Sequence, residues 1–379
     1  MLVPDGMADE PLEVLGGRTP LQAAATPAMD AMARQGVVGV VQTVPDGFAP
    51  GSDVANLSVL GYDAAAVYTG RSPLEAASIG IDLGPDDVAY RCNLVTIADG
   101  VMRDNTAGHI ATEQARVLIE ALGRAFSGTP FEFHTGVSYR HLLVWRGGEL
   151  VPCTPPHDIL DRPIGDYLPP GAAGATLRQI MQTAHELLGR LRPGTDIWVW
   201  GEGKAPRLLR FAQLHGLRGA VVGAVDLVRG LGVYAGLDVL DVPGATGGLD
   251  TDYGAKGRVA LEALARFDFV FVHVEAPDEA AHMGAVQEKV VAIERVDAEV
   301  LAPLRDAGQR PAVLVLPDHL TPIRTRTHAS SPVPFVYAAS GLQLGGPSAP
   351  AYDEAAAAAT GLSLPSGEAL MTRFLTATA

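Results

Sequence analysis

Short apolar runs, separated by stretches of helical character, constrain the fold of this chain more than any other feature of its sequence. Residues 36–44 (GVVGVVQTV), 219–225 (GAVVGAV) and 267–274 (FDFVFVHV) are apolar on both faces of a strand. Such runs are typical of buried strands in a parallel sheet that helices cover. Similar runs occupy 2–4, 196–201 and 312–318. The pattern predicts an α/β fold, with a mainly parallel sheet and helices on both of its faces.

The middle of the chain has a different pattern. Residues 90–97 (YRCNLVTI) and 138–152 alternate apolar and polar side chains, which is typical of an antiparallel sheet with one face in water. A chain of 379 residues is also long for a single hydrophobic core. We therefore expect a core formed by residues 1–84 and 193–379, with residues 85–192 inserted as a smaller α+β cap domain.

Composition excludes several classes of partner. The chain has 43 acidic and 28 basic residues, a formal net charge of -15, which argues against a nucleic-acid or anionic-membrane binder. Its two cysteines, Cys92 and Cys153, cannot form a disulfide framework, and no apolar run is long enough to span a membrane. We expect a soluble cytoplasmic protein, with homo-oligomers left open.

Potential metal ligands follow several of the predicted strands. Asp5 follows the first strand, Asp318 and His319 follow the run at 312–318, and His328 lies in the loop beyond them. In "FVHVEAPDEAAHMG", Asp278 and His282 are four residues apart, so on a helix both side chains would project from one face.

An aspartate after a strand is, by itself, more often a cap or turn residue than a metal ligand. Their coincidence in several segments favours a shared site, because ligand sites form beyond the carboxyl ends of the strands in open α/β sheets. Three carboxylates and three imidazoles suit two divalent ions rather than one. Mn²⁺ or Zn²⁺ fits such a mixed set better than Ca²⁺ does.

A candidate nucleophile lies in "FAPGSDVANLSVLGYD". Ser52 follows the turn at Pro50 and Gly51 and precedes a predicted helix. At that place the helix N-terminus would stabilise an anionic phosphate. The alternative is that Ser52 and Asp53 only cap the helix.

Together these segments carry a family resemblance. "VPDG", "GSDVANLSVLGYD", "YTGRSPLEAASIGI", "APDEAAH" and "PDHLTP", with His328 after them, resemble the cofactor-independent phosphoglycerate mutases of the archaeal type, within the alkaline phosphatase superfamily. The likeness runs over essentially the whole chain. It implies an alkaline-phosphatase-like core and an isomerase that interconverts 3-phosphoglycerate and 2-phosphoglycerate, a small phosphorylated substrate, without 2,3-bisphosphoglycerate.

The resemblance also implies roles for individual residues. Ser52 would carry the phosphoryl group as a phosphoserine. One ion would be held by Asp5, Ser52, Asp318 and His319, and the other by Asp278, His282 and His328. The ions would be Mn²⁺ or Zn²⁺, with Mg²⁺ and Co²⁺ as alternatives.

The inserted domain would grip the glycerate and shield the phosphoserine from water. Arginine suits a carboxylate or phosphate through its bidentate fork, and each basic residue could equally be a solvated surface residue. The candidates for substrate binding are Arg71, Arg91, Asp104, His109, Arg140, His141 and Lys204, with Asp104 and His109 as acid/base groups.

Two alternatives share the same core. The longer bacterial mutases have a histidine where this chain has Asn56, and a bacterial subgroup with very similar motifs has been proposed to act as a homoserine kinase. A metal-dependent phosphatase would differ only in letting water attack the phosphoserine. No ATP-binding motif is recognisable in the sequence, which weakens the kinase alternative.

Overall fold

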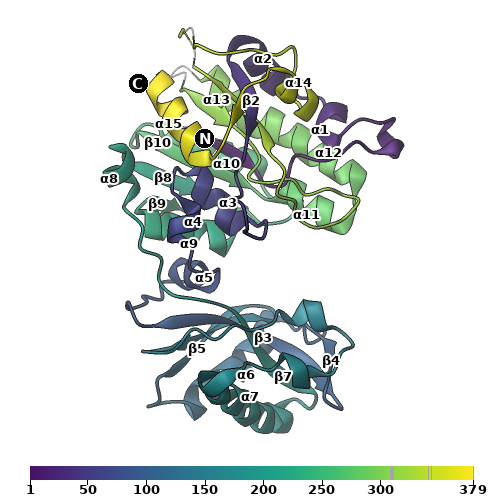
Figure 1. Cartoon of the computed structure of the whole chain (residues 1–379), viewed down its shortest axis with the longest axis vertical. Coiled ribbons are helices and arrows are strands. Elements are labelled where there is room, and N and C mark those ends of the chain that lie inside the picture. Colours follow the sequence, from purple (N-terminus) through teal and green to yellow (C-terminus); the bar gives the residue numbers. More distant parts are fainter. Residues whose placement is uncertain (308–310, 340, 343, 379) are drawn as a thin grey trace. The chain divides into compact units, whose positions relative to one another are not determined.

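The computed structural model describes residues 1–379 except 308–310, 340, 343 and 379. Its chain divides into two compact units (Figure 1). The first unit combines Met1–Tyr68 with Arg207–Ala379, and the second is Thr69–Pro206. The protein is therefore a mixed α/β structure in which the second unit is a single continuous insertion into the first.

An eight-stranded sheet forms the centre of the first unit. Its strands, in spatial order, are β13 (Ser363–Leu364), β2 (Val37–Val41), β12 (Val333–Ala338), β11 (Val313–Val315), β1 (Leu2–Pro4), β10 (Phe269–Val274), β8 (Gly219–Val222) and β9 (Asp238–Leu240).

The sheet is mainly parallel, as the apolar runs predict. Strands β11, β1, β10, β8 and β9 pair in parallel, and β13 pairs in parallel with β2. Strand β12 runs antiparallel to both β11 and β2. Its sequence, VPFVYA, is not among the runs singled out above, because Pro334 within it is unusual for a strand inside a sheet.

Helices cover both faces of this sheet. Val270 and Val272 of β10 pack in one core cluster with Met29 of helix α2. On the opposite face, Phe374 of helix α15 contacts the ring of Tyr337 edge-on at a centroid distance of 5.8 Å. The helical segments of this unit are η1 (Glu13–Leu15), α1 (Pro20–Ala23), α2 (Pro27–Gln35), α3 (Ser52–Val59), α4 (Ala64–Val67), α8 (Phe211–His215), α9 (Asp226–Ala235), α10 (Tyr253–Ala263), α11 (Ala276–Met283), α12 (Val286–Arg295), η4 (Val296–Leu301), α13 (Ala302–Asp306), α14 (Glu354–Ala359) and α15 (Gly367–Thr378).

The second unit is an antiparallel sheet packed with helices. Its strands are β3 (Val88–Ala98), β4 (Val101–Asp104), β5 (Phe131–Val137), β6 (Arg140–Trp145) and β7 (Thr195–Gly203), and its helical segments are α5 (Ser72–Ser78), α6 (Thr112–Ala125), η2 (Pro156–Ile159), η3 (Ile164–Tyr167) and α7 (Gly171–Leu191). Strand β3 is central, because β4, β6 and β7 all pair with it in antiparallel register.

The expectation that residues 196–201 belong to the parallel sheet is wrong. They lie in β7, which pairs antiparallel with β3, and Trp198 and Val199 are buried in the core of the second unit. The run is apolar because Ile197, Trp198 and Val199 all pack into that core. The unit also begins at Thr69 and ends at Pro206, outside the expected limits of 85 and 192, since β7 belongs to its sheet and Ser72 of α5 hydrogen-bonds to Gly201.

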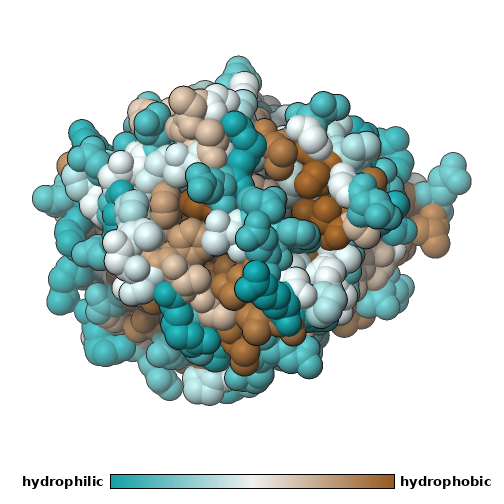
Figure 2. All heavy atoms as spheres, turned by 90° about the horizontal axis from the view of Figure 1, so that it is seen from below, coloured by the Kyte–Doolittle hydropathy of each residue, from teal (hydrophilic) through white to brown (hydrophobic). Residues whose placement is uncertain are grey.

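Hydrophilic and apolar residues are interspersed over the surface shown in Figure 2. Within the part of the chain that the structure describes, no helix is both long enough and apolar enough to cross a membrane.

One buried carboxylate ties the helices of the first unit together. Asp297, in the π-helical segment η4, accepts hydrogen bonds from the backbone N–H groups of Ala28 at 3.0 Å and Met29 at 2.7 Å. These donors lie in the first turn of α2, where no intrahelical acceptor exists. The Thr26 side chain does not cap this helix, so Asp297 takes that role.

We predict that Asp297→Ala lowers the free energy of unfolding by about 2 kcal/mol or more, because two buried donors lose their acceptor. Asp297→Asn, which keeps one oxygen, should lose less. Denaturant unfolding followed by circular dichroism measures both variants. An Ala variant as stable as the unchanged protein would contradict this role.

Candidate active site

Three aspartates meet at the carboxyl edge of the central sheet. Asp5 directly follows β1, Asp318 lies beyond β11, and Asp278 is in the first turn of α11, which follows β10. Strand β1 lies between β11 and β10 and is parallel to both, so the three strands end at the same edge. All three carboxylates are buried.

The Asp278 cluster consists of Asp278, His282 and His328. His282 Nε2 lies 3.1 Å from Asp278 Oδ2 and 3.0 Å from His328 Nε2. His328 Nε2 is 3.6 Å from Asp278 Oδ1. The one-turn spacing of Asp278 and His282 on α11 brings their side chains together, as the sequence predicts.

The Asp5 cluster consists of Asp5, Asp318 and His319, with Ser52 beside it. His319 Nε2 is 3.6 Å from one oxygen of each aspartate. Ser52, the first residue of α3, places its Oγ 3.1 Å from His319 Nε2 and 3.5 Å from Asp5 Oδ2. The two clusters adjoin, because the rings of His319 and His328 lie 4.0 Å apart between centroids.

The three histidines present the same ring nitrogen to the site. His282 Nδ1 lies 2.9 Å from the Arg326 carbonyl, and His328 Nδ1 lies 3.4 Å from that of Pro50. A carbonyl only accepts, so Nδ1 carries a proton in both rings and Nε2 is the nitrogen that faces the site. Metal-binding histidines are commonly oriented in this way.

The electrostatics of the Asp5 cluster call for added positive charge. Burial, and then the neighbouring carboxylates of Asp318 and Asp278, raise the pKa of Asp5 well above its usual value. Asp5 Oδ1 is buried and has no hydrogen-bond partner among the residues that the structure describes. Burial also lowers the pKa of His319.

In the Asp278 cluster the pKa of the carboxyl group shifts in the opposite direction. Burial acts to raise the pKa of Asp278, but hydrogen bonds from His282 and His328 hold it well below its usual value. The Asp278 carboxylate raises the pKa of His282 to about 9. Crowded carboxylates, an unpartnered oxygen and converging imidazole nitrogens suit divalent cations, so the residues present fit a two-metal centre.

Comparison with known proteins supports a single family. The sequence model of a family described as 2,3-bisphosphoglycerate-independent phosphoglycerate mutase matches residues 33–191. A protein of that name from Methanothrix thermoacetophila is 49% identical over 386 aligned residues, which cover 98% of this chain and 97% of the relative. A probable enzyme of that name from Geobacter sulfurreducens is 50% identical, over 99% and 98% of the two chains.

This chain belongs to the 2,3-bisphosphoglycerate-independent phosphoglycerate mutase family. Solved structures agree with that assignment. A cofactor-independent phosphoglycerate mutase from Thermoplasma acidophilum matches with a TM-score of 0.70 at 26% identity, covering 100% of this chain and 98% of that chain. A protein from Pyrococcus horikoshii matches with a TM-score of 0.84, also at 26% identity, covering 100% and 97%.

The structure of this mutase-family chain brings all seven sequence-predicted side chains of the metal site together. They are Asp5, Ser52, Asp278, His282, Asp318, His319 and His328. That they hold cations stays a prediction.

Other polar residues support this site and were not identified from the sequence. Asn56 donates to Asp318 Oδ2 at 2.9 Å and to the Ser52 carbonyl at 2.8 Å, which fixes the nucleophile's helix against one ligand. Thr321 contacts both clusters. Asn56 was noted only as a departure from the longer mutases, although its spacing from Ser52 places both on one helix face.

A buried chain of ionisable groups lies behind Asp5. His273 Nε2 is 3.6 Å from Asp5 Oδ2, and its Nδ1 is 3.1 Å from Glu275 Oε1. Lys256 Nζ lies 3.6 Å from Glu275 Oε2 and donates to the His273 carbonyl. The signal for these residues was the polar pair inside the apolar run "FVFVHVEAP", where buried ionisable side chains are unusual without partners.

The proposed substrate-binding residues all lie in the second unit, where the structure places several of them together. Arg71 and Arg91 both pair with Glu75, at 3.0 and 3.1 Å. The Arg91 guanidinium also lies over the Trp200 ring, 4.5 Å from its centroid. Asn93, beside Arg91 on β3, pairs in register with the exposed Arg140 of β6.

The remaining candidates have local structural roles. Asp104 accepts hydrogen bonds from Thr106 and Gly108. Partial burial acts to raise the pKa of Asp104, but these hydrogen bonds outweigh it and hold the pKa below its usual value. His109 is exposed in the same turn. His141 is buried and accepts from the Gly136 N–H, while the Lys204 carbonyl accepts from Thr69.

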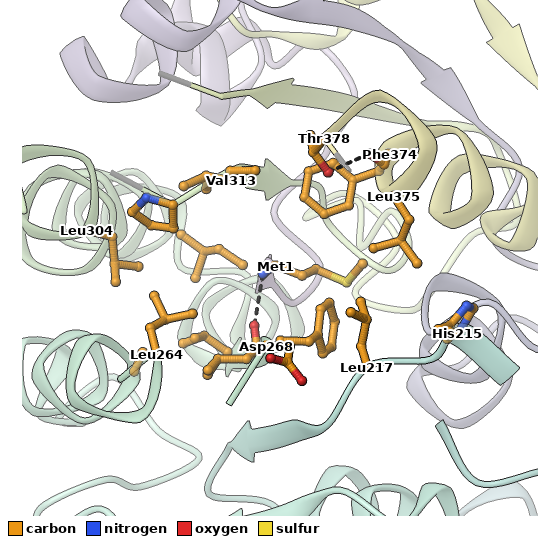
Figure 3. A pocket seen from close by; sticks show the side chains of 17 residues that line it. Met1, His215, Leu217, Leu264, Asp268, Leu304, Val313, Phe374, Leu375 and Thr378 are labelled. Carbon is orange, nitrogen blue, oxygen red and sulfur yellow. Dashed lines mark hydrogen bonds between the residues drawn. The ribbon is translucent and has the colours of Figure 1, made fainter. Parts of the chain in front are cut away.

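Figure 3 shows a cavity of about 430 Å³ in the first unit, whose lining includes none of these cluster residues. It is lined by residues at the amino ends of the strands, including Phe269, which begins β10, and Val313, which begins β11. The seven side chains described above lie at the carboxyl ends. The cavity is therefore not part of the candidate active site.

We predict that Asp278→Asn and His282→Ala each reduce bound metal from about two ions per chain towards one, because each removes a ligand from one cluster only. Elemental analysis after dialysis against Zn²⁺ or Mn²⁺ measures the change. Asp241→Asn, at an exposed carboxylate outside both clusters, is the matched control. Full occupancy in both cluster variants would contradict the ligand assignment.

The burial of His141 leads to a separate prediction about how the stability of the protein depends on pH. Burial lowers the pKa of His141 to about 4, whereas an unfolded histidine titrates near about 6.5. Between these values the unfolded chain binds more protons, so the free energy of unfolding should fall as the pH drops from about 6.5 to about 4. His141→Gln should flatten this dependence, as measured by denaturant unfolding at several pH values. An unchanged slope would show that His141 is accessible to protons in the folded state.

Proposed function

We propose that the chain interconverts 3-phosphoglycerate and 2-phosphoglycerate through a phosphoserine at Ser52, within a site built for two divalent cations. The observation that carries this proposal is the position of Ser52. Ser52 is the first residue of helix α3. Its hydroxyl lies within hydrogen-bond distance of His319, beside the Asp5 carboxylate. A serine that only capped the helix would have no need of these neighbours.

The proposed ligands divide between the two ions as the clusters do. Asp5, Ser52, Asp318 and His319 would hold one ion, and Asp278, His282 and His328 would hold the other. When bound, the cations lower the pKa of the serine hydroxyl and neutralise charge on the transferring phosphoryl group. Mn²⁺ or Zn²⁺ suits the mixed donors, with Mg²⁺ and Co²⁺ as alternatives.

The protein's own residues position the nucleophile and the phosphoryl group. Asn56 holds the Ser52 carbonyl and the Asp318 carboxylate in one orientation. The N-terminus of α3 favours the negative charge of a phosphoryl group on Ser52. Ser52 Oγ would attack the phosphorus, and the bond to the 3-oxygen of glycerate would break.

Glycerate would then turn while still bound, and its 2-oxygen would attack the phosphoserine. The bond between phosphorus and Ser52 breaks in this second step, so the enzyme is regenerated and no free 2,3-bisphosphoglycerate takes part. A phosphatase would instead let water attack the same phosphoserine. Exclusion of water therefore decides between the two outcomes.

We further propose that the first unit is an alkaline-phosphatase-like core and that the second unit is a substrate-binding cap, with a cytoplasmic location for the whole protein. Arg71 and Arg91, which both form ion pairs with Glu75, and Arg140 support recognition of the glycerate carboxylate. The planar guanidinium group of arginine can form two parallel hydrogen bonds with a carboxylate. Asp104, His109, His141 and Lys204 remain weaker candidates, because each of them already makes, or lies in, a local structural contact.

Ser52→Ala tests the phosphoserine. We expect turnover of 3-phosphoglycerate, followed by coupled enolase without added 2,3-bisphosphoglycerate, to fall at least about 1,000-fold, because the nucleophile is lost. The matched control is Ser58→Ala, on the same helix, whose hydroxyl only accepts from the Gly367 N–H. Circular dichroism should show that both variants are folded.

Parallel assays separate the alternatives. Release of free phosphate without 2-phosphoglycerate would favour a phosphatase, and ATP-dependent phosphorylation of homoserine would favour a kinase. Unchanged mutase turnover in Ser52→Ala would refute the phosphoserine. Mass spectrometry of the acid-quenched protein, incubated with substrate, should find the phosphate on Ser52.

A further inference from the structure

One hydroxyl connects the two candidate metal clusters. Thr321 is fully buried, and its Oγ1 lies 2.5 Å from Asp278 Oδ1 and 3.2 Å from His319 Nδ1. Asp278 belongs to one cluster and His319 to the other. Thr321 is in neither cluster, and the proposed function gives it no role.

The protons of this contact can be assigned by counting donors. A threonine hydroxyl has one proton to donate, and an ionised carboxylate can only accept. The Thr321 proton must therefore point to Asp278. The Thr321 oxygen then accepts from His319, so Nδ1 of that ring carries the proton and Nε2 keeps the lone pair that faces Ser52.

This arrangement differs from that of the other two histidines. Backbone carbonyls orient His282 and His328, and a carbonyl fixes one tautomer whatever surrounds it. The tautomer of His319 depends on a hydroxyl that could otherwise rotate and donate to its ring. Asp278 prevents that rotation, so the state of one cluster depends on a ligand of the other.

The surrounding backbone leaves Thr321 no freedom to move away. Its N–H donates to the Ala8 carbonyl, and its own carbonyl accepts from Lys289 Nζ at 2.9 Å. Lys289 is in turn paired with Asp9 at 2.7 Å, and both side chains are completely buried. The contact also needs a glycine at position 6, because a Cβ on Gly6 would lie 2.5 Å from both Thr321 Oγ1 and Asp278 Oδ1.

We propose that Thr321 is a positioning residue that fixes the Nδ1–H tautomer of His319 and the orientation of Asp278, and thereby couples the two metal clusters. This inference rests on the metal ligands assigned under the proposed function. It adds a requirement that the ligand set alone does not contain: both clusters should bind ions weakly when this hydroxyl is absent.

The test uses three variants of the full-length protein. Thr321→Val keeps the shape of the side chain and removes the hydroxyl, whereas Thr321→Ser keeps the hydroxyl. Thr43→Val is the matched control, because Thr43 is also buried but its hydroxyl has no hydrogen-bond partner in the described part of the chain. Zn²⁺ and Mn²⁺ binding is measured by competition with a chelator, and thermal unfolding is measured on the metal-free proteins.

We expect Thr321→Val to weaken binding of both ions by about 10-fold to 100-fold, the range found when a group that orients a metal ligand is removed. Thr321→Ser and Thr43→Val should bind as the unchanged protein does. If Thr321→Val lowers only the melting temperature of the metal-free protein and leaves both affinities intact, Thr321 has a purely structural role and the inference fails.

A measurement on the unchanged protein separates this inference from the ligand assignment. The ¹⁵N chemical shifts of the histidine rings, recorded without metal, should show His319 protonated at Nδ1, and a proton at Nε2 would overturn the inference even if Thr321→Val failed to fold. Failure of the unchanged protein to bind two ions would instead refute the proposed ligand set.

Discussion

The mutual repulsion of three buried carboxylates is the constraint on which the rest of this structure depends. Asp5, Asp278 and Asp318 meet because three adjacent parallel strands end at one edge of the sheet. Burial makes such crowding unfavourable unless positive charge balances it. His282, whose pKa the Asp278 carboxylate raises, and the buried Lys256 supply part of that charge, and bound cations would supply the remainder.

Much of the surrounding polar structure can be understood as support for this crowded group. Asn56 holds Asp318, Thr321 holds Asp278, and His273 lies against Asp5 with Glu275 behind it. Each carboxylate therefore has its own neighbour in the protein, which limits its rotation before any ion arrives. Orientation of this kind is what makes ligand affinity and geometry reproducible in metal centres.

The sequence was sufficient to predict the parallel sheet and the seven converging side chains. Strand ends are visible as the points where apolar runs stop, and Asp5, Asp278 and Asp318 all follow such points. The same reasoning misplaced residues 196–201, because an antiparallel strand whose side chains are buried can be as apolar as a parallel one. Strand β12 was not predicted, because Pro334 inside it is unusual for a strand within a sheet.

The supporting residues could not be predicted, because their roles depend on partners that are distant in sequence. Nothing near Thr321 indicates that it will contact His319 and Asp278 at once, and nothing near Lys289 indicates a partner at Asp9, 280 positions earlier. Asp297 is a similar case, since it caps a helix whose first turn lies 269 residues before it. Local patterns identify groups that face a common edge, whereas tertiary packing decides which of them touch.

The way the second unit is inserted has a consequence for how such proteins diversify. The chain leaves the first unit once, after Tyr68, and returns once, at Arg207, and none of the seven converging side chains lies between those points. Exchange of this single segment by recombination would leave the seven converging side chains unchanged while it replaced every residue of the second unit. If the second unit binds the substrate, as proposed, new specificities could be acquired in this way without rebuilding the site on the central sheet.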